Sequence, residues 1–277
     1  MPSSNPHKGH SSPLDSEQDR QFAITLARGL EVLRAFTASE PVLTNRAISD
    51  RTKLHKATVS RLCYTLTLFG YLRQTDTGAY TLGTAVLSLA HPLLASLPLR
   101  QVARPMLQEL AAKTGCTVNL ASRERVSAIY IDTVRPDISN PYLPDVGSVS
   151  PLLQSAIGRA LILAHQGQDR TQLLNRIKIS DPGQYEQGLE FLAADEELLR
   201  TNGYCSARGS WKADIDAIAT PIPLPRQYEI AAINCTISTR AKRRVDLDTV
   251  APLLLLTARQ IAVANGIEHS SRRTTRL

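Results

Sequence analysis

The first eighty residues carry hydrophobic positions at helical spacing, followed by a short alternating segment. Between Phe22 and Phe36, apolar side chains recur every three or four residues, which predicts a helix with one apolar stripe formed by Phe22, Leu26, Leu30, Leu33 and Phe36. After the break at Glu40-Pro41, Thr44 is a suitable N-cap for a second, short helix at 45–51.

The stretch from Leu54 to Leu72 predicts a third helix with two different faces. Its apolar residues fall on or near one side, namely Ala57, Leu62, Leu66 and Phe69. Its first turns carry small polar and cationic side chains, namely Lys56, Thr58, Ser60 and Arg61. Segments 71–74 and 79–82 then flank Thr75-Asp76-Thr77-Gly78, which is typical of a hairpin turn. Helices joined by a tight turn and followed by a β-wing indicate an N-terminal winged helix-turn-helix domain over 22–83.

The rest of the chain predicts a linker helix and an α+β domain. Residues 84–98 form an apolar helical segment that we expect to be interrupted at His91-Pro92. Beyond it we expect helices at 100–113, 155–164, 169–177, 185–202 and 246–265, and strands at 117–122, 127–132, 217–222 and 230–238. Strands that pair over short loops among helices favour an antiparallel sheet, so 99–269 is predicted to be an α+β domain. The polar ends, 1–21 and 270–277, are expected to be disordered tails.

Charge favours a polyanionic partner. The 277-residue chain has a formal net charge of +7, and eight Lys or Arg oppose four acidic residues between Phe22 and Gly83. The four cysteines, at positions 63, 116, 205 and 235, have neither metal-site nor disulfide spacing and are expected to be reduced thiols in a cytoplasmic protein. No apolar run approaches the roughly 20 residues that cross a bilayer. We therefore expect no membrane partner, no metal and no cofactor.

The third helix, its preceding helix and the wing carry the candidate contacts to a double-stranded DNA operator. Lys56 and Arg61 can neutralise phosphates or contact guanine, and hydroxyl side chains nearby can reach bases or phosphates. The start of the second helix would present a backbone N–H and a hydroxyl to a phosphate. The expected contacts are Thr44, Asn45, Lys56, Thr58, Ser60, Arg61 and Arg73.

The order of these parts resembles the IclR family of bacterial transcription regulators, over about residues 22 to 268. The stretch 26–36 is similar to the family's first helix, and 54–62 followed by Gly70-Tyr71-Leu72 resembles its recognition helix and the start of its wing. In the second domain, Val146-Gly147-Ser148, Pro151 and 155–160 resemble the loop and helix start beneath the family's effector pocket. Segments 218–222 and 231–234 resemble two of its strands.

The resemblance implies a ligand-responsive regulator, not an enzyme, with a GAF-like effector-binding domain and a homodimeric or homotetrameric assembly. The family pocket holds a small organic acid against backbone amides at a helix N-terminus, where the dipole favours a carboxylate. In this chain the resemblance places the effector site at Ser155, Ala156, Ile157, Ile215, Ala217, Asn234 and Thr236. Arg208 or Trp211 could close its mouth, and Cys235 should face the opposite side of the sheet.

The small, apolar walls of this site favour an aromatic or short aliphatic carboxylate, and the family often controls catabolic operons. Two other functions remain open. One is a constitutive DNA-binding protein whose second domain only oligomerises, which the implied pocket argues against. The other is an enzyme, but none of the six histidines has a partner motif, and the chain has no nucleophile motif or nucleotide-binding fingerprint.

Overall fold

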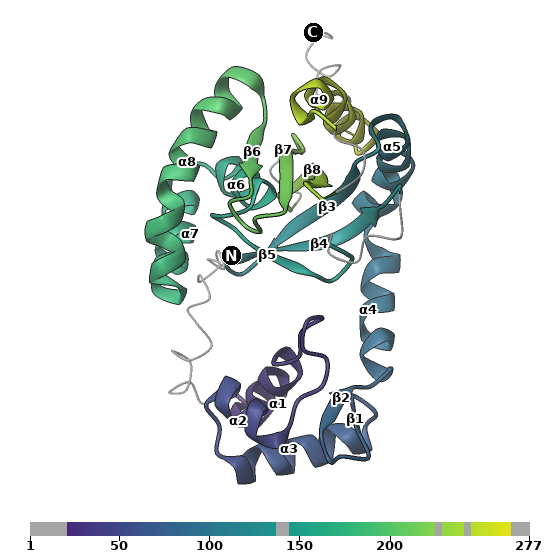
Figure 1. The fold of residues 1–277 in the computed structure, drawn as a ribbon, viewed down its shortest axis with the longest axis vertical. Coiled ribbons are helices and arrows are strands. Elements are labelled where there is room, and N and C mark those ends of the chain that lie inside the picture. The colour runs from purple at the N-terminus through teal and green to yellow at the C-terminus, as the bar shows by residue number, and fades with distance from the viewer. Residues whose placement is uncertain (1–20, 137–143, 225–228, 241–244, 267–277) are drawn as a thin grey trace, which may run out of the picture. The chain divides into compact units, whose positions relative to one another are not determined.

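The computed structural model describes residues 21–136, 144–224, 229–240 and 245–266 (Figure 1). The chain divides into two compact units, Met1–Leu93 and Leu94–Leu277, and the boundary falls within helix α4 (Ala85–Ser96). The predicted C-terminal tail, and the N-terminal one up to residue 20, lie outside the described residues.

The first unit contains three helices and a two-stranded hairpin. The helices are α1 (Ile24–Arg34), α2 (Asn45–Thr52) and α3 (Lys56–Leu68), and the hairpin pairs β1 (Leu72–Gln74) with β2 (Tyr80–Leu82) in antiparallel register. Thr44 is the N-cap of α2, as expected, because its hydroxyl accepts the Ala47 N–H at 3.2 Å. Gly70, with a φ of +75°, follows the end of α3. The helix-turn-helix and its wing are therefore present as predicted.

The predicted apolar stripes of the first and third helices are only partly correct: Leu33, Phe36, Leu62 and Leu66 pack in the core, and other members do not. In α1 the buried residue is Val32, whereas Leu26 and Leu30 are 64% and 51% exposed. In α3 the buried residues are Val59 and Cys63, whereas Ala57 is exposed. At 100° per residue, Ala57 lies on the opposite side of α3 from Val59. The sequence of this helix is therefore compatible with more than one apolar face. Only the small core between α1, α2, α3 and β1 selects among them.

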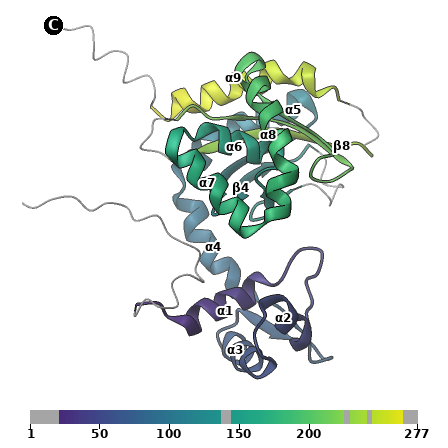
Figure 2. The ribbon, with the colours of Figure 1, turned by 90° about the vertical axis from the view of Figure 1, so that its left-hand side faces the viewer.

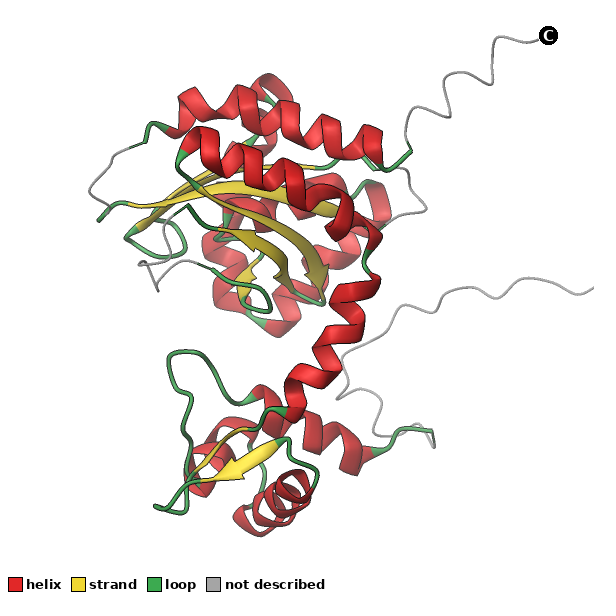
Figure 3. Ribbon diagram, turned by 90° about the vertical axis from the view of Figure 1, so that its right-hand side faces the viewer, coloured by secondary structure: helices red, strands yellow, loops and turns green. Residues whose placement is uncertain are grey.

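The second unit is built on one curled sheet of six antiparallel strands in the order β5-β4-β3-β8-β7-β6. The strands are β3 (Thr117–Glu124), β4 (Ser127–Val134), β5 (Val149–Pro151), β6 (Cys205–Arg208), β7 (Ile215–Pro221) and β8 (Ala231–Ser238). The helices are α5 (Pro98–Thr114), α6 (Ala156–Ala164), α7 (Gly167–Ser180), α8 (Pro182–Asn202) and α9 (Leu247–Ala264). Helices α5 and α9 cover one face of the sheet, and α6, α7 and α8 lie on the other (Figures 2 and 3). The α+β prediction is confirmed.

Two local predictions were wrong, and two short strands were not predicted. Helix α4 continues through Pro92, because the residues on both sides of it keep helical geometry although the proline donates no hydrogen bond. Strands β3 and β4 extend further than expected, so their turn is Arg125-Val126, with Arg125 at a φ of +54°. The short edge strands β5 and β6 were not predicted, because each is defined by its pairing with one neighbouring strand.

Helix α9 is long and apolar enough, by length and composition, to cross a membrane. Its buried residues, which include Leu254 and Ile261, belong instead to the core between the sheet and α5. This helix therefore forms part of the hydrophobic core of the second unit.

Candidate functional site

Three cationic side chains of the helix-turn-helix surface, Lys56, Arg61 and Arg73, are free to contact a partner. Lys56 is the first residue of α3, and both Lys56 and Arg61 are exposed. Arg73 is exposed on β1 of the wing. Within the described residues, no hydrogen bond or ion pair holds these three side chains. They can therefore neutralise phosphates without first breaking an internal contact.

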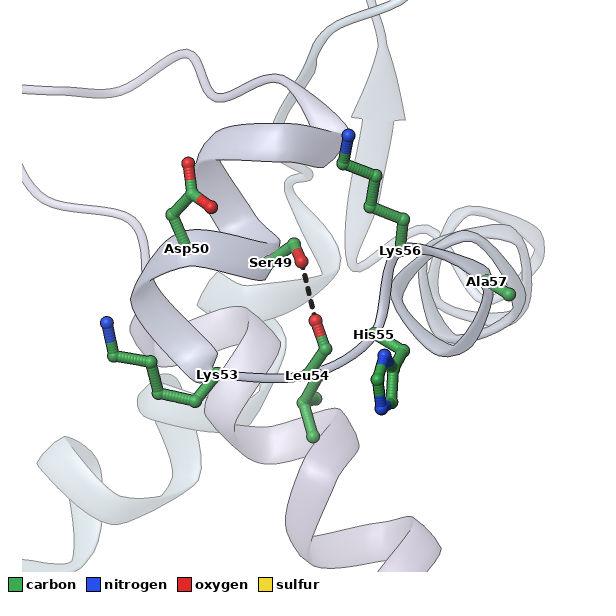
Figure 4. Close-up of a pocket in the computed structure, with 7 residues that line it drawn as sticks. All are labelled: Ser49, Asp50, Lys53, Leu54, His55, Lys56 and Ala57. Carbon is green, nitrogen blue, oxygen red and sulfur yellow. Dashed lines mark hydrogen bonds between the residues drawn. The ribbon is translucent and has the colours of Figure 1, made fainter.

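The turn between α2 and α3 is held by two hydrogen bonds from side chains. Ser49 Oγ donates to the Leu54 carbonyl at 2.5 Å, and Asn45 Nδ2 donates to Ser60 Oγ at 2.9 Å. Figure 4 shows the open, shallow depression at this turn, which is lined by Ser49, Asp50, Lys53, Leu54, His55, Lys56 and Ala57. The first turn of α3 is thus fixed against α2, which orients Lys56 and the residues that follow it.

Not every polar residue predicted to face DNA is unoccupied. The Thr44 hydroxyl already caps α2, and the Asn45 amide is bound to Ser60, whereas Thr58 is half-buried. Tyr64, also on α3, has a side chain that is 67% exposed. Because Tyr64 follows Arg61 by three residues, it lies on the same outward face of α3.

In the second unit, six of the seven predicted effector residues line one cavity. The cavity is lined by Tyr130, Pro144, Ser155, Ala156, Ala207, Trp211, Ile215, Ala217, Asn234 and Thr236. The seventh predicted residue, Ile157, is fully buried in the core beneath α6. Sequence reasoning missed Tyr130, Pro144 and Ala207. For Tyr130, the available signal was its inward position in the alternating pattern of β4.

Strand alternation explains why these residues converge. Asn234 and Thr236 point to the α6 side of the sheet, while Cys235 lies in the core on the α5 and α9 side, as expected. Arg208 does not reach the cavity, because its guanidinium donates to Asp248 Oδ1 at 3.0 Å. Trp211 is the residue of the predicted pair that forms part of the wall.

The cavity is nearly closed. Its free volume is about 10 Å³, which is room for about one water molecule. Any larger ligand must therefore move the walls apart when it binds.

The N-terminus of α6 forms one end of the cavity. Ser155 is its N-cap: the hydroxyl accepts the Gly158 N–H at 3.1 Å and donates to the Pro151 carbonyl at 2.6 Å. The cap leaves the N–H groups of Ala156 and Ile157 without an intrahelical acceptor, at the positive end of the helix dipole. Gly158 lets α6 pack closely against the backbone of Leu152, because a Cβ at position 158 would lie 2.4 Å from the Leu152 carbonyl oxygen.

A buried ion pair fixes α6 to its neighbours. Arg159, 1% exposed, donates from Nε to Asp195 Oδ2 on α8 at 2.5 Å, and from its two Nη atoms to the carbonyls of Leu153 and Ser206 at 2.7 Å each. Asp195 Oδ1 accepts the Ser206 N–H at 2.9 Å. These bonds join α6, α8, β6 and the loop before α6 into one framework.

Tyr130 is the ionisable side chain in the cavity wall. Burial raises the pKa of Tyr130 to about 12, so its hydroxyl stays protonated and can donate a hydrogen bond. All four cysteines are buried free thiols. Among the described residues, no group of three or more His, Cys, Asp or Glu side chains could hold a metal ion.

Comparison with known proteins places both units in one family. The family model described as "Bacterial transcriptional regulator IclR C-terminal" matches residues 91–263, and the one described as "IclR helix-turn-helix domain" matches residues 25–76.

Full-length relatives agree with these matches. The chain is 30% identical to the Pca regulon regulatory protein of Pseudomonas putida, over 88% of this chain and 84% of that protein. It is 25% identical to the p-hydroxybenzoate hydroxylase transcriptional activator of Acinetobacter baylyi, over 92% of this chain and 97% of that protein. An IclR-family transcriptional regulator from Brucella abortus has a similar structure, with 36% identity, a TM-score of 0.77 and coverage of 90% of this chain and 94% of that one.

Proposed function

Because the chain belongs to the IclR family of bacterial transcription regulators, we propose that α3 binds a DNA operator and that the cavity beside α6 binds a small carboxylate effector. The protein is a DNA-binding transcription regulator and not an enzyme. The operator, the effector and the operon that it controls form the proposal. Residues 22–83 would be the DNA-binding domain, 84–98 the linker helix and 99–269 the effector-binding domain. We further propose a homodimer or homotetramer in the cytoplasm.

The free cations of the helix-turn-helix surface carry the DNA part of the proposal. Lys56 and Arg61 extend from the first two turns of α3, the part of a recognition helix that meets the major groove. Arg73 on the wing would contact the flanking phosphate backbone. Arg51 is different, because it donates to the Ala35 carbonyl at 2.6 Å and pairs with Glu40, so we assign it a structural role.

The substitution Arg61→Ala tests this assignment. We expect binding to DNA upstream of the protein's own gene and the flanking genes to weaken about 10- to 100-fold, because a base-contacting arginine contributes roughly 1–3 kcal/mol. The melting temperature should stay unchanged. Arg46→Ala is the matched control, since Arg46 is exposed and lies near Asp50 on α2. A large fall in the melting temperature of Arg61→Ala would show that the residue packs instead.

The open amides of α6 carry the effector part of the proposal. The N–H groups of Ala156 and Ile157 favour a carboxylate, and the other walls of the cavity are mostly apolar. An aromatic or short aliphatic acid fits such walls, and the name of the Acinetobacter relative, which refers to p-hydroxybenzoate, favours the aromatic class. Since the cavity must widen around a ligand, the ligand would stabilise an open form and so shift the populations of the second unit.

A ligand panel separates this function from constitutive DNA binding. Benzoate, 4-hydroxybenzoate and short aliphatic acids would be added to the full chain while its melting temperature is measured. A stabilising acid should also change DNA affinity, and Asn234→Ala should abolish that change while leaving DNA affinity intact. If no acid in the panel changes the melting temperature, a second domain that only oligomerises would be favoured. Light scattering of the full chain would distinguish a dimer from a tetramer.

A further inference from the structure

A bulge in β4 places two polar residues three positions apart on the same side of the sheet. Leu120 pairs with Asp132, but the next residue, Ala121, pairs with Tyr130, so Ile131 is the extra residue. Because of this insertion, Tyr130 and Thr133 both face the cavity side. Each meets a buried asparagine there.

Asn119 on β3 is fully buried and lies behind the cavity wall. Both polar atoms of its side chain form hydrogen bonds. Its Oδ1 accepts the Thr133 hydroxyl at 3.0 Å. Its Nδ2 donates to Asn234 Oδ1 at 2.7 Å and to Thr236 Oγ1 at 3.4 Å. In this arrangement the Nδ2 end of the Asn119 amide faces β8, and turning the Asn119 amide alone would set its oxygen against the Asn234 oxygen.

The Asn119–Asn234 bond couples the orientations of the two amides. With its oxygen occupied by Asn119, Asn234 turns its Nδ2 donors toward the cavity, which it lines together with Tyr130. Tyr130 donates in turn to Ser150 Oγ at 3.3 Å. Ser150 lies 3.2 Å from Ser155 Oγ, whose own proton is given to the Pro151 carbonyl. The Ser150 hydroxyl must therefore donate to Ser155, and all the bonds run in one direction.

Both ends of the cavity offer hydrogen-bond donors, and the Trp211 indole in its wall carries a further N–H. At α6 they are the N–H groups of Ala156 and Ile157, because the Ser155 hydroxyl is saturated. At β8 they are the Nδ2 hydrogens of Asn234 and the hydroxyl of Thr236, whose oxygen already accepts from Asn119. Apolar side chains such as Ile215 and Ala217 complete the wall.

We propose that the effector carries a hydrogen-bond acceptor at each end, with a carboxylate at α6 and a second oxygen acceptor at Asn234 and Thr236. Asn119 is the positioning residue that sets this preference without touching the ligand. A ligand whose far group can only donate, such as an ammonium or an amidinium, would place its donors against those of Asn234 and Thr236. The donors on both sides would then lack acceptors. This inference rests on the proposed effector function and specifies its ligand class.

Pairs of acids that differ only at the far group test the inference on the unmodified full chain. We would titrate terephthalate against 4-amidinobenzoate, and glutarate against 4-aminobutanoate, with Trp211 fluorescence as the readout. Terephthalate and glutarate, which carry two acceptor groups, should bind about 10- to 100-fold more tightly than their counterparts. This ratio corresponds to the cost of roughly 1–3 kcal/mol for leaving a buried donor unpaired. Equal affinities would overturn the inference while leaving the effector pocket in place. If no acid binds, the proposed effector function itself fails.

Two substitutions test the role of Asn119. Asn119→Asp removes its N–H donors, so Asn234 and the Thr236 hydroxyl should turn toward it, and the preference for terephthalate over 4-amidinobenzoate should shrink or reverse. Thr133→Val removes only the hydroxyl that orients Asn119 and should reduce the ratio less. Thr133→Ser, which keeps the hydroxyl, is the matched control and should preserve the ratio. If both variants weaken the two ligands by the same factor, Asn119 is merely structural and the positioning role is refuted.

Discussion

Replacing Arg159 by methionine should destabilise the second unit strongly. The substitution keeps the apolar part of the side chain but removes the three donors that reach Asp195, Leu153 and Ser206. Asp195, 3% exposed, would then be a buried carboxylate with no cation beside it. Removing one partner of such a pair costs about 3–5 kcal/mol of unfolding free energy.

A second ion pair, between Arg170 on α7 and Glu196 on α8, provides a matched control. Arg170 binds Glu196 through both Nη atoms, at 2.6 and 3.0 Å, but the Glu196 side chain is 57% exposed. Water can solvate Glu196 once its partner is gone, so Arg170→Met should cost no more than about 1 kcal/mol. The two substitutions delete the same charge from ion pairs whose acidic partners are consecutive residues.

Trp211 makes the measurement specific to this unit. It is the only tryptophan in the chain, and it lies in the cavity wall, so its fluorescence follows unfolding of the second unit during urea titration. With a slope of roughly 1–3 kcal/mol/M, Arg159→Met should lower the midpoint by about 1 M or more. The double variant Arg159→Met/Asp195→Leu should recover most of the loss, because no buried charge remains. Equal, small shifts for Arg159→Met and Arg170→Met would refute the reasoning.

Two further predictions concern the same unit. Gly158→Ala should cost about 2–3 kcal/mol, because its Cβ would meet the Leu152 backbone at 2.4 Å, whereas Gly183→Ala, with its nearest atom at 3.7 Å, should be neutral or stabilising; urea titration measures both. Burial lowers the pKa of His165, whose Nδ1 bonds to the Leu161 carbonyl, so the unfolded chain binds the proton first. Stability should therefore fall as pH drops below about 6.5, and His165→Gln should flatten this dependence in melting curves from pH 8 to 5.

The sequence predicted those parts of the fold that follow from local chemistry. The cap at Thr44, the turn at Gly78 and the end of α8 at Gly203 are each fixed by one residue type in one backbone conformation. The edge strands could not be predicted, because three or four residues become a strand only when a neighbouring strand pairs with them. The apolar stripes of α1 and α3 were only partly predicted for a related reason, since burial depends on which side of each helix meets the core.

For the predicted cavity residues, the sequence predicted where the side chains lie but not which hydrogen bonds they make. Asn234 and Thr236 line the cavity because β8 alternates regularly, and Ala156 does so because it opens α6. Ser155 is in the wall, but its hydroxyl serves the cap and the hydrogen-bond chain, so it offers the ligand no donor. A sequence pattern places a side chain on a face, whereas its remaining hydrogen-bonding capacity depends on partners brought from other elements.

The bulge at Ile131 shows how far one residue can change the chemistry of the cavity. Without it, strict alternation would send Asp132 to the same face as Tyr130, and a buried carboxylate would stand beside the site proposed for an acidic effector. With it, Asp132 turns to α5, where it binds Arg104 at 2.5 Å and lies 3.6 Å from Arg100. Thr133 takes the cavity side instead and orients Asn119. The same insertion therefore removes a negative charge from the pocket and supplies the hydroxyl that begins its chain of donors.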